Sequence, residues 1–348
     1  VVGKADDAHA VDRAFELAGE AGGVGVGLGR APEEGDVHAA LEVLAGPDSG
    51  LVAARAAIAA GRVPPGGIVT PADGLSELFA RIAADLGRQR AAVISLSSAR
   101  LATFLAPQNA EGWLITADLL SAGGKPEAAI AALDHVGPGD PYYRRALSAK
   151  TGLLLGLDRK DEAVTLARAQ TEAATAEVAD WTRYGDVLNA LDRHGEAAEA
   201  YTRALDLTAD ADAGRWQVLL MLGSALEQSG NWTAAEPALR DALKLAPDQG
   251  VVLNYLGYSL LEHGGDLDEA ERLIARAHDL NPEQGAIVDS LGWVNYRQGR
   301  FEQAIQLLER AAASEPVEPT INEHLGDAYW RAGRMVDARF AWQAALVG

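Results

Sequence analysis

The stretches VLNYLGYS (residues 252–259), IVDSLGW (287–293) and INEHLGDAYW (321–330) are three versions of one motif. Each is built around a Leu-Gly pair, and a fourth such pair occupies residues 222–223. The four leucines are 34, 35 and 34 residues apart. A period of this length is typical of helical hairpins that stack side by side, because one hairpin cannot bury its own apolar face.

The rest of each unit recurs in the same register. Thirteen residues after the leucine comes an alanine, one place later in the second unit: Ala235, Ala270, Ala304 and Ala338. A large residue stands four places further on, at Leu239, Ile274, Leu308 and Trp342. A second alanine lies three beyond, and Pro247, Pro282 and Pro316 close the first three units. This pattern resembles the tetratricopeptide repeat, whose helix-turn-helix unit has 34 residues.

Each recurring residue has a physical role in such a hairpin. Glycine and alanine at repeat positions 8 and 20 let the two helices approach closely, and large residues fill the space around that contact. Gly230, Gly299 and Gly333 fall where the first helix must stop, since glycine accepts a left-handed backbone. The closing proline cannot continue the second helix.

Weaker versions of the pattern extend upstream to about residue 76. The sequence therefore predicts an all-α fold, an α-solenoid of stacked helix-turn-helix hairpins in a right-handed superhelix. About eight units are expected, at residues 76–109, 110–143, 144–177, 178–215, 216–249, 250–284, 285–318 and 319–348. A four-residue insertion within 208–214 separates the fourth unit from the fifth. The last unit ends without a polar capping helix, so self-association through that end is one expectation.

Residues 1–75 form a less regular region in this interpretation. Residues 5–21, 36–45 and 51–60 are expected to be short helices, and the Pro- and Gly-rich stretch 63–71 an extended connector. The run GGVGVGLG at 22–29 contains a pattern close to a dinucleotide fingerprint. It lacks the preceding strand and following helix which that site requires, so we interpret it as a loop.

Composition narrows the possible functions. The formal net charge is −20, which disfavours nucleic acids and anionic membrane surfaces as partners. No cysteine is present, which excludes disulfides and thiolate chemistry. No apolar run approaches the ~20 residues of a membrane span. The chain begins Val1-Val2-Gly3, as in a piece of a longer protein, so membrane attachment is expected only through an anchor outside this sequence.

No group of residues predicts catalysis. The seven histidines are scattered and make no metal-ligand spacing, and no nucleophile elbow or phosphate-binding loop occurs. His324, with Asp327 one turn further on, is interpreted as part of a solvated helix face. We therefore expect no enzyme activity, no cofactor and no metal.

Protein binding is the function that the resemblance implies. In the tetratricopeptide family the first helix of each hairpin lines a concave groove. By register, the groove residues of the last three units are Asn254, Tyr258, Glu262, Asp289, Trp293, Tyr296, Arg297, Glu323, Asp327, Trp330 and Arg331. Aromatic residues and arginine dominate binding hot spots. The alternative is that Tyr258 and Trp293 simply pack between helices.

Two narrower resemblances bear on the partner. Family members that bind acidic chaperone tails use a Lys/Asn/Arg clamp at these positions. Here only Asn254 matches, and Asp289 and Glu323 would repel a carboxylate. The three opening motifs are similar to exported or lipid-anchored bacterial tetratricopeptide proteins that act as adaptors of C-terminal processing proteases. That resemblance implies a periplasmic or outer-membrane-associated scaffold. The alternatives are a cytoplasmic location and a docking array cut from a larger enzyme such as a glycosyltransferase.

Overall fold

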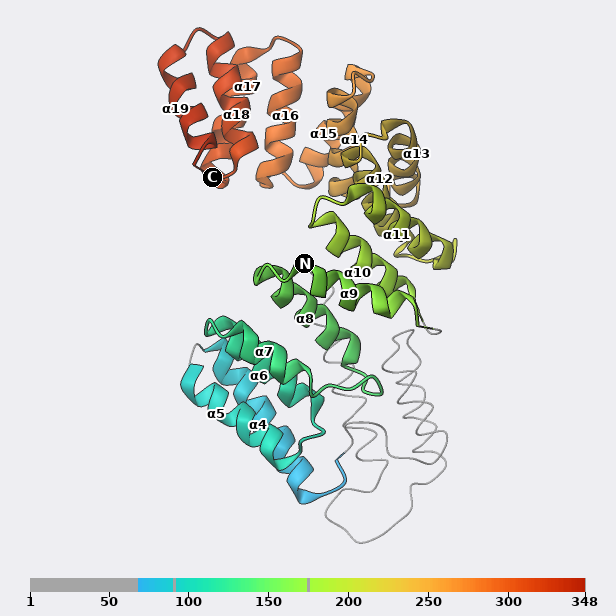
Figure 1. Ribbon diagram of the computed structural model, residues 1–348. Helices are drawn as coiled ribbons and strands as arrows, with labels where there is room; N and C mark the ends of the chain where they lie inside the picture. The colour runs from blue at the N-terminus through green and yellow to red at the C-terminus, as the bar shows by residue number, and fades with distance from the viewer. Residues whose placement is uncertain (1–67, 90–91, 174–175, 348) are drawn as a thin grey trace. The chain divides into compact units, whose positions relative to one another are not determined.

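The computed structural model describes residues 68–347 except 90–91 and 174–175 (Figure 1). Within these residues it contains sixteen helices and no strand, which confirms the all-α solenoid class. The helices are α4 (Pro71–Arg88), α5 (Ala92–Leu105), α6 (Ala110–Ala122), α7 (Pro126–Leu133), α8 (Tyr143–Gly156), α9 (Lys160–Thr171), α10 (Val178–Asn189), α11 (His194–Leu207), α12 (Arg215–Gln228), α13 (Trp232–Leu245), α14 (Gly250–Glu262), α15 (Leu267–Leu280), α16 (Gly285–Arg297), α17 (Phe301–Ser314), α18 (Pro319–Arg331) and α19 (Met335–Ala345).

The chain divides into two compact units, residues 1–169 and 170–348. In the second unit each even-numbered helix, here called an A helix, packs on the odd-numbered B helix that follows it. Each B helix then packs on the next A helix, so α11 contacts α12 and α17 contacts α18. The superhelix predicted for the whole array stays a prediction. Most of the predicted N-terminal region, with its glycine run and three short helices, lies outside the described residues.

Glycine ends most A helices, as the sequence predicted. Gly230, Gly299 and Gly333 have φ values of 83°, 79° and 81°, the left-handed region that glycine enters without a Cβ clash. Asp158 and Asp192 hold the equivalent turns after α8 and α10, each with φ of 57°. Aspartate tolerates this conformation better than most residues because its short polar side chain can bond locally.

The A and B helices of the later hairpins touch at the glycine of the Leu-Gly pair. A Cβ built on Gly257 would lie 2.6 Å from Ile274, and one on Gly326 would lie 2.3 Å from Trp342. Ala304, which was predicted to lie between its own two helices, has an exposed fraction of 0%. The same is true of the equivalent alanines 235, 270 and 338. The predicted close approach of the helices is therefore present.

The helix of the first unit, α4, begins at Pro71, five residues before the predicted unit boundary at 76. Thr70 accepts a hydrogen bond from the backbone of Asp73, and the Asp73 carboxylate accepts one from the backbone of Thr70. This capping box nucleates the helix. Proline is favoured as the first helical residue, where its missing N–H costs nothing. Pro71 was expected to end an extended connector, whereas it is the start signal of a helix.

Candidate protein-binding surface

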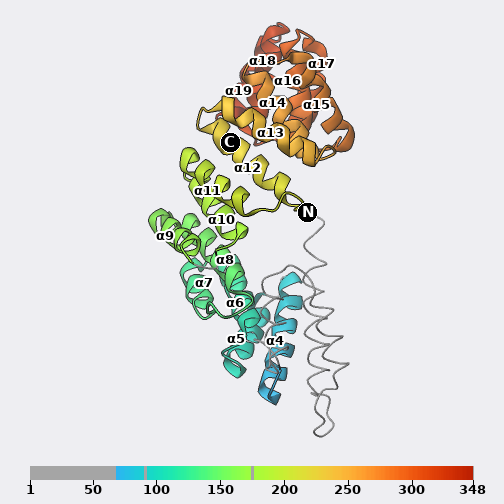
Figure 2. The same cartoon turned by 90° about the vertical axis from the view of Figure 1, so that its right-hand side faces the viewer.

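The predicted groove residues all come from α14, α16 and α18. These three A helices contact each other in order, and Figure 2 labels them one above another, from α14 up to α18. The side chains recur at spacings of three and four residues, so each helix presents them on one face. We call the predicted residues on these three helices the A-helix surface.

A column of stacked rings joins α16 to α18. The Trp293 ring stacks on Tyr296 of its own helix, with centroids 4.5 Å apart, and on His324 of α18, with centroids 4.0 Å apart. Arg331 extends the column, because its guanidinium lies 5.9 Å from the centre of the Tyr296 ring and 4.8 Å from that of Phe301. Trp293 and Tyr296 are thus engaged within the protein, which supports the alternative that Trp293 packs between helices.

Glu262 ties α14 to α16. One carboxylate oxygen accepts a hydrogen bond from the indole Nε1 of Trp293 at 2.9 Å and another from Arg297 at 3.4 Å. The glutamate is exposed at the end of α14, whereas its two partners lie on successive turns of α16. The contact holds the Trp293 ring in the orientation that stacking on His324 requires.

His324 is not part of a solvated face, contrary to the expectation from the sequence. Its side chain and that of Asp289 are each only 8% exposed, and Nδ1 lies 3.0 Å from both oxygens of the Asp289 carboxylate. Because a carboxylate only accepts, Nδ1 must carry the hydrogen and donate it. Asp327, the expected neighbour of His324, instead accepts a hydrogen bond from Trp342 at 3.1 Å.

Sequence reasoning missed this buried pair because its members are 35 residues apart. The distance is one repeat plus one residue, which brings side chains of neighbouring A helices together. The only signal was the register itself, since His324 replaces Ser290 and Tyr255 at the same place in the two preceding units.

The residues of the A-helix surface that remain accessible lie mainly on α18. The Trp330 side chain is 50% exposed, and its ring is tilted against Trp342 with centroids 5.7 Å apart. Glu323 and Arg331 are exposed, as is Arg297 on α16. These side chains could contact a partner. The stacked rings hold Arg331 in place, and Glu262 holds Arg297.

The repeat pattern of the sequence matches a known protein family. Residues 220–284 and 290–348 match the tetratricopeptide repeat, and residues 181–210 match a second description of the same repeat. The chain carries tetratricopeptide repeats. The matched residues all lie between α10 and α19, the same part of the sequence in which the repeat is most regular.

Solved structures share the tetratricopeptide architecture at low sequence identity. The monomeric mutant of IFIT1 with m7Gppp-AAAA is 16% identical, with 78% of this chain and 69% of that chain covered and a TM-score of 0.52. MamA from Desulfovibrio magneticus RS-1 is 18% identical, over 50% of this chain and 96% of that chain, with a TM-score of 0.41. A crystal structure of MamA is 23% identical over 47% and 92%, with a TM-score of 0.37. No curated protein matches the sequence. The IFIT1 likeness supports the fold alone.

Tyr258 of α14 lies near His324 of α18, with the two ring centroids 6.2 Å apart. Its side chain is half-buried, and burial is the main cause that raises the pKa of its hydroxyl. Glu262, Asp289, Glu227 and Glu323 raise that pKa further, because a phenolate would be repelled by their negative charges. Burial and these charges together favour the neutral form of the Tyr258 hydroxyl.

Asn254 lies one helical turn before Tyr258 and has an unused acceptor. Its side-chain oxygen is buried and has no hydrogen-bond partner. Buried polar groups are usually paired, because leaving one unpaired costs about 1–3 kcal/mol. Asn254 and Tyr258 are on the same face of α14, one turn apart.

Other sites are not apparent in the described part of the chain. Residues 68–347, with their two short gaps, contain no group of three or more histidine and acidic side chains that could hold a metal ion. Over the same residues, no helix combines the length and the apolar character needed to cross a membrane.

Proposed function

We propose that this chain is a non-catalytic scaffold that holds a segment of another protein against the A-helix surface of α14, α16 and α18. The observation that supports this most is the contact network across the three helices. Glu262, Trp293 and His324 link each A helix to the next, so the exposed groups are held in place before a partner arrives. Such preorganisation reduces the entropy lost on binding.

A protein partner fits better than a nucleic acid. The IFIT1 structure contains a capped oligonucleotide, but this chain has a formal net charge of −20 and carries carboxylates on the face in question. Nucleic-acid affinity depends mainly on neutralising phosphates with lysine and arginine. Tetratricopeptide arrays in general hold protein segments, and the exposed Trp330, Arg297 and Arg331 are residue types common in protein hot spots.

The resemblance to protease adaptors supports a narrower form of the proposal. In that form the scaffold works in the bacterial periplasm or at the outer membrane and presents substrates to a C-terminal processing protease. The resemblance rests on the three Leu-Gly motifs of α14, α16 and α18. Fractionation of the source cells, with the protein detected by antibody, tests the location. Recovery in the cytoplasm alone would contradict it.

A binding experiment tests the scaffold itself. A partner is first captured with the full chain and its affinity measured, and then Arg297→Ala, Trp330→Ala and Arg331→Ala are compared with the unchanged protein. A true hot spot costs at least about 2 kcal/mol, or ~30-fold in affinity. Trp293 is left unchanged, because truncating it would break the stacked column and confuse binding with folding.

The control substitutions lie on the opposite side of the hairpins. Glu302→Ala and Arg310→Ala change exposed residues of α17, a B helix, and should alter affinity less than about 2-fold. Circular dichroism should show unchanged helicity in all five variants. If the α17 variants abolish binding and the A-helix variants do not, the surface is wrongly assigned.

A further inference from the structure

The outer side of α19 is apolar where the preceding B helices are mostly charged. The comparison uses the positions two residues before the buried alanine of each B helix, and two and six residues after it. In α11, α13, α15 and α17 these positions hold Gly195, Glu199 and Arg203; Thr233, Pro237 and Asp241; Asp268, Arg272 and Arg276; and Glu302, Gln306 and Arg310. All twelve residues are exposed, eight are charged, and none is a large apolar residue. In α19 the same positions hold Val336, Phe340 and Ala344, here called the α19 stripe.

The two large side chains of the α19 stripe are open to solvent. Val336 is 68% exposed and Phe340 is 66% exposed. The three residues of the stripe are four apart, so they lie along one face of the helix. Leu346 and Val347, which directly follow α19, are also exposed. Adjoining exposed apolar residues of this kind mark a surface that contacts another molecule.

A further hairpin added to the array in the same manner would not cover this stripe. An A helix packs on each of α11, α13, α15 and α17, yet the equivalent positions on these B helices stay exposed. The next A helix instead covers other positions, as where Ile305 and Leu308 of α17 are buried in one cluster with Leu325 of α18. Their equivalents on α19 are Arg339 and Trp342. The stripe is therefore suited to a different occupant.

The distribution of charge favours a second copy of this chain as that occupant. Two chains that each carry a net charge of −20 repel one another over most of their surfaces. The last hairpin is the exception, because residues 319–347 contain three acidic residues and three arginines. Residues 250–284, by contrast, contain seven acidic residues and two arginines. Two copies can thus meet at α19 with little repulsion.

We propose that two copies of this chain associate through their α19 stripes, with Phe340 of each copy packed against the stripe of the other. An uncharged apolar stripe is complementary to itself, as a two-fold symmetric contact requires. The stripe shares no residue with the A-helix surface, so the inference does not depend on the proposed function. A dimer would present two A-helix surfaces and would hold a partner with two binding segments more tightly than a monomer does.

Sedimentation velocity of the full chain, from nanomolar to high micromolar concentration, tests the association. The chain should change from monomer to dimer as its concentration rises. Added salt should strengthen the dimer, because screening weakens the repulsion between two acidic chains. Sedimentation as a monomer over the whole range would overturn the proposal.

Matched substitutions test whether the α19 stripe is the contact. Phe340→Glu and Val336→Glu should each weaken the dimer about 10-fold or more, because each places a charge in an apolar contact. Gln306→Glu and Thr233→Glu add the same charge at the same repeat positions of α17 and α13, and should change it less than about 2-fold. All four positions are exposed, so circular dichroism should show unchanged helicity. A dimer that persists in Phe340→Glu, or that Gln306→Glu weakens equally, would overturn the assignment.

Crosslinking then locates the contact directly. The chain contains no cysteine, so a single introduced cysteine can carry a photoreactive label at a chosen position. A label on Ala344→Cys should join two copies, with the crosslinks mapped by mass spectrometry to α19. The control is Arg310→Cys, at the same repeat position of α17, which should join none. Crosslinks from Ala344→Cys that map only to helices other than α19 would contradict the two-fold contact.

Discussion

The hairpins of α4–α9 and those of α10–α19 carry different residues at one pair of repeat positions, one on the A helix and one on the B helix. In the later hairpins, glycine on the A helix faces a large residue on the B helix, in the pairs Gly185/Tyr201, Gly223/Leu239, Gly257/Ile274, Gly292/Leu308 and Gly326/Trp342. At the equivalent register, the earlier hairpins have Ala83/Ala99, Ala117/Leu133 and Thr151/Ala167. All six of these residues are buried.

The difference shows that the hairpin contact accepts several combinations of residues. Where the A helix has alanine or threonine, the B helix has alanine or leucine. Where the A helix has glycine, the B helix has leucine, isoleucine, tyrosine or tryptophan. Cores tolerate apolar substitutions best when the total volume changes little, so a change at one member of a pair should matter less when the other member compensates. The family match begins at residue 181, in the part of the chain where the A helices carry glycine at this position.

The largest expected effect comes from removing a large member of one pair. Ile274→Ala would leave a cavity against Gly257, because Ile274 is fully buried and its partner has no side chain to fill the space. Substitutions of this kind cost about 2–5 kcal/mol. Urea unfolding followed by circular dichroism measures the loss. Leu207→Ala, at a residue that is 51% exposed, is the control and should cost less than about 1 kcal/mol.

A second effect concerns the buried link between A helices. In the later region this link is His324–Asp289, and in the earlier region it is Asn109 donating to Ser76 at 2.8 Å. His324→Phe keeps an aromatic ring against Trp293 but leaves the Asp289 carboxylate unpaired, at a cost of about 1–3 kcal/mol. Hydrogen exchange should rise first in α16 and α18. Protection that stays unchanged there would contradict the structural role of the pair.

Replacing glycine by alanine should lower the stability at Gly257 in the later region and raise it at Gly152 in the earlier region. Gly257→Ala overpacks Ile274 at a cost of about 1–3 kcal/mol. That cost exceeds the ~1 kcal/mol that alanine gains over glycine within a helix. A Cβ placed on Gly152, inside α8, would have no neighbouring atom within 4 Å. Gly152→Ala should therefore stabilise by up to about 1 kcal/mol.

The double variant tests whether the two volumes compensate. Gly257→Ala combined with Ile274→Ala approaches the pairing of Ala83 with Ala99, so the added methyl group fills part of the cavity. The combined loss should be smaller than the sum of the single losses, as expected for residues in contact. If the two single losses of stability are strictly additive, the added methyl group does not compensate for the volume removed at Ile274.

The smallest effect is electrostatic. Arg240 on α13 bonds to Glu269 on α15 at 2.7 Å and lowers the pKa of that carboxyl. A lowered pKa in the folded state stabilises above the ordinary glutamate value of 4.5. This stabilisation is lost as the pH falls through the lowered value. Because both side chains are partly exposed, screening by solvent limits the contribution to less than about 1 kcal/mol.

Glu269→Gln should therefore lower stability at neutral pH and have no effect in strong acid. Thermal unfolding followed across this pH range measures the difference from the unchanged chain. Glu162 serves as the comparison, since its pKa is also lowered by an arginine, Arg159, but the two belong to one helical turn. Glu162→Gln should have the smaller effect on unfolding because it breaks no link between helices.

The fold was predictable from the sequence because each repeat contains the residues that determine the geometry of its own hairpin. Leu-Gly pairs, helix-ending glycines and closing prolines act within a few residues, so they can be read without a structure. The start of α4 was missed because Thr70 and Pro71 belong to no repeat position and form an ordinary capping box. The candidate surface was less predictable, since register placed its residues on one face but could not show which contacts they make.

The different surroundings of Trp293 and Trp330 illustrate this limit. Trp293 and Trp330 come from the same motif, yet one is stacked between neighbours and the other is half exposed. Their difference follows from their neighbours: His324 of α18 covers Trp293, whereas Trp330 lies against Trp342 of α19. Contacts between repeats depend on several side chains at once, and a single register position cannot specify them.

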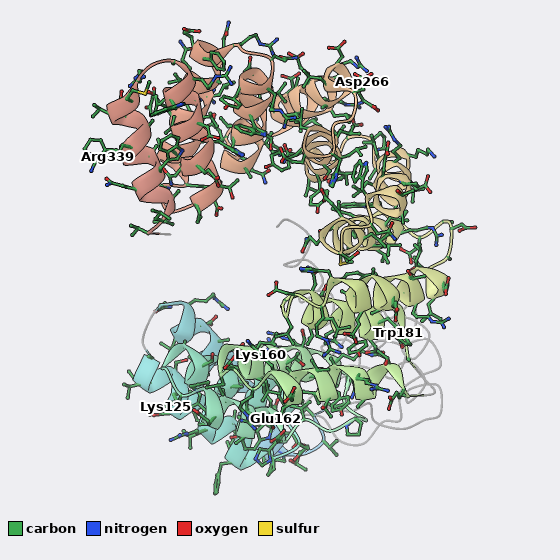
Figure 3. The ribbon with its side chains drawn as sticks, turned by 45° about the horizontal axis from the view of Figure 1, so that its top comes forward. Lys125, Lys160, Glu162, Trp181, Asp266 and Arg339 are labelled. Atoms are coloured by element: carbon green, nitrogen blue, oxygen red, sulfur yellow. The ribbon has the colours of Figure 1, made fainter. Side chains whose placement is uncertain are left out.

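The glycine contacts also determine where such an array can be cut and rejoined. Figure 3 shows Asp266 at the turn between α14 and α15, and Arg339 on α19. A genetic crossover at a turn of this kind would join an A helix from one ancestor to a B helix from another. Alanine opposite Trp342 would collide, and glycine opposite Ala167 would leave a hole. Crossovers between hairpins avoid both faults, so whole hairpins are the units that duplication and recombination can move.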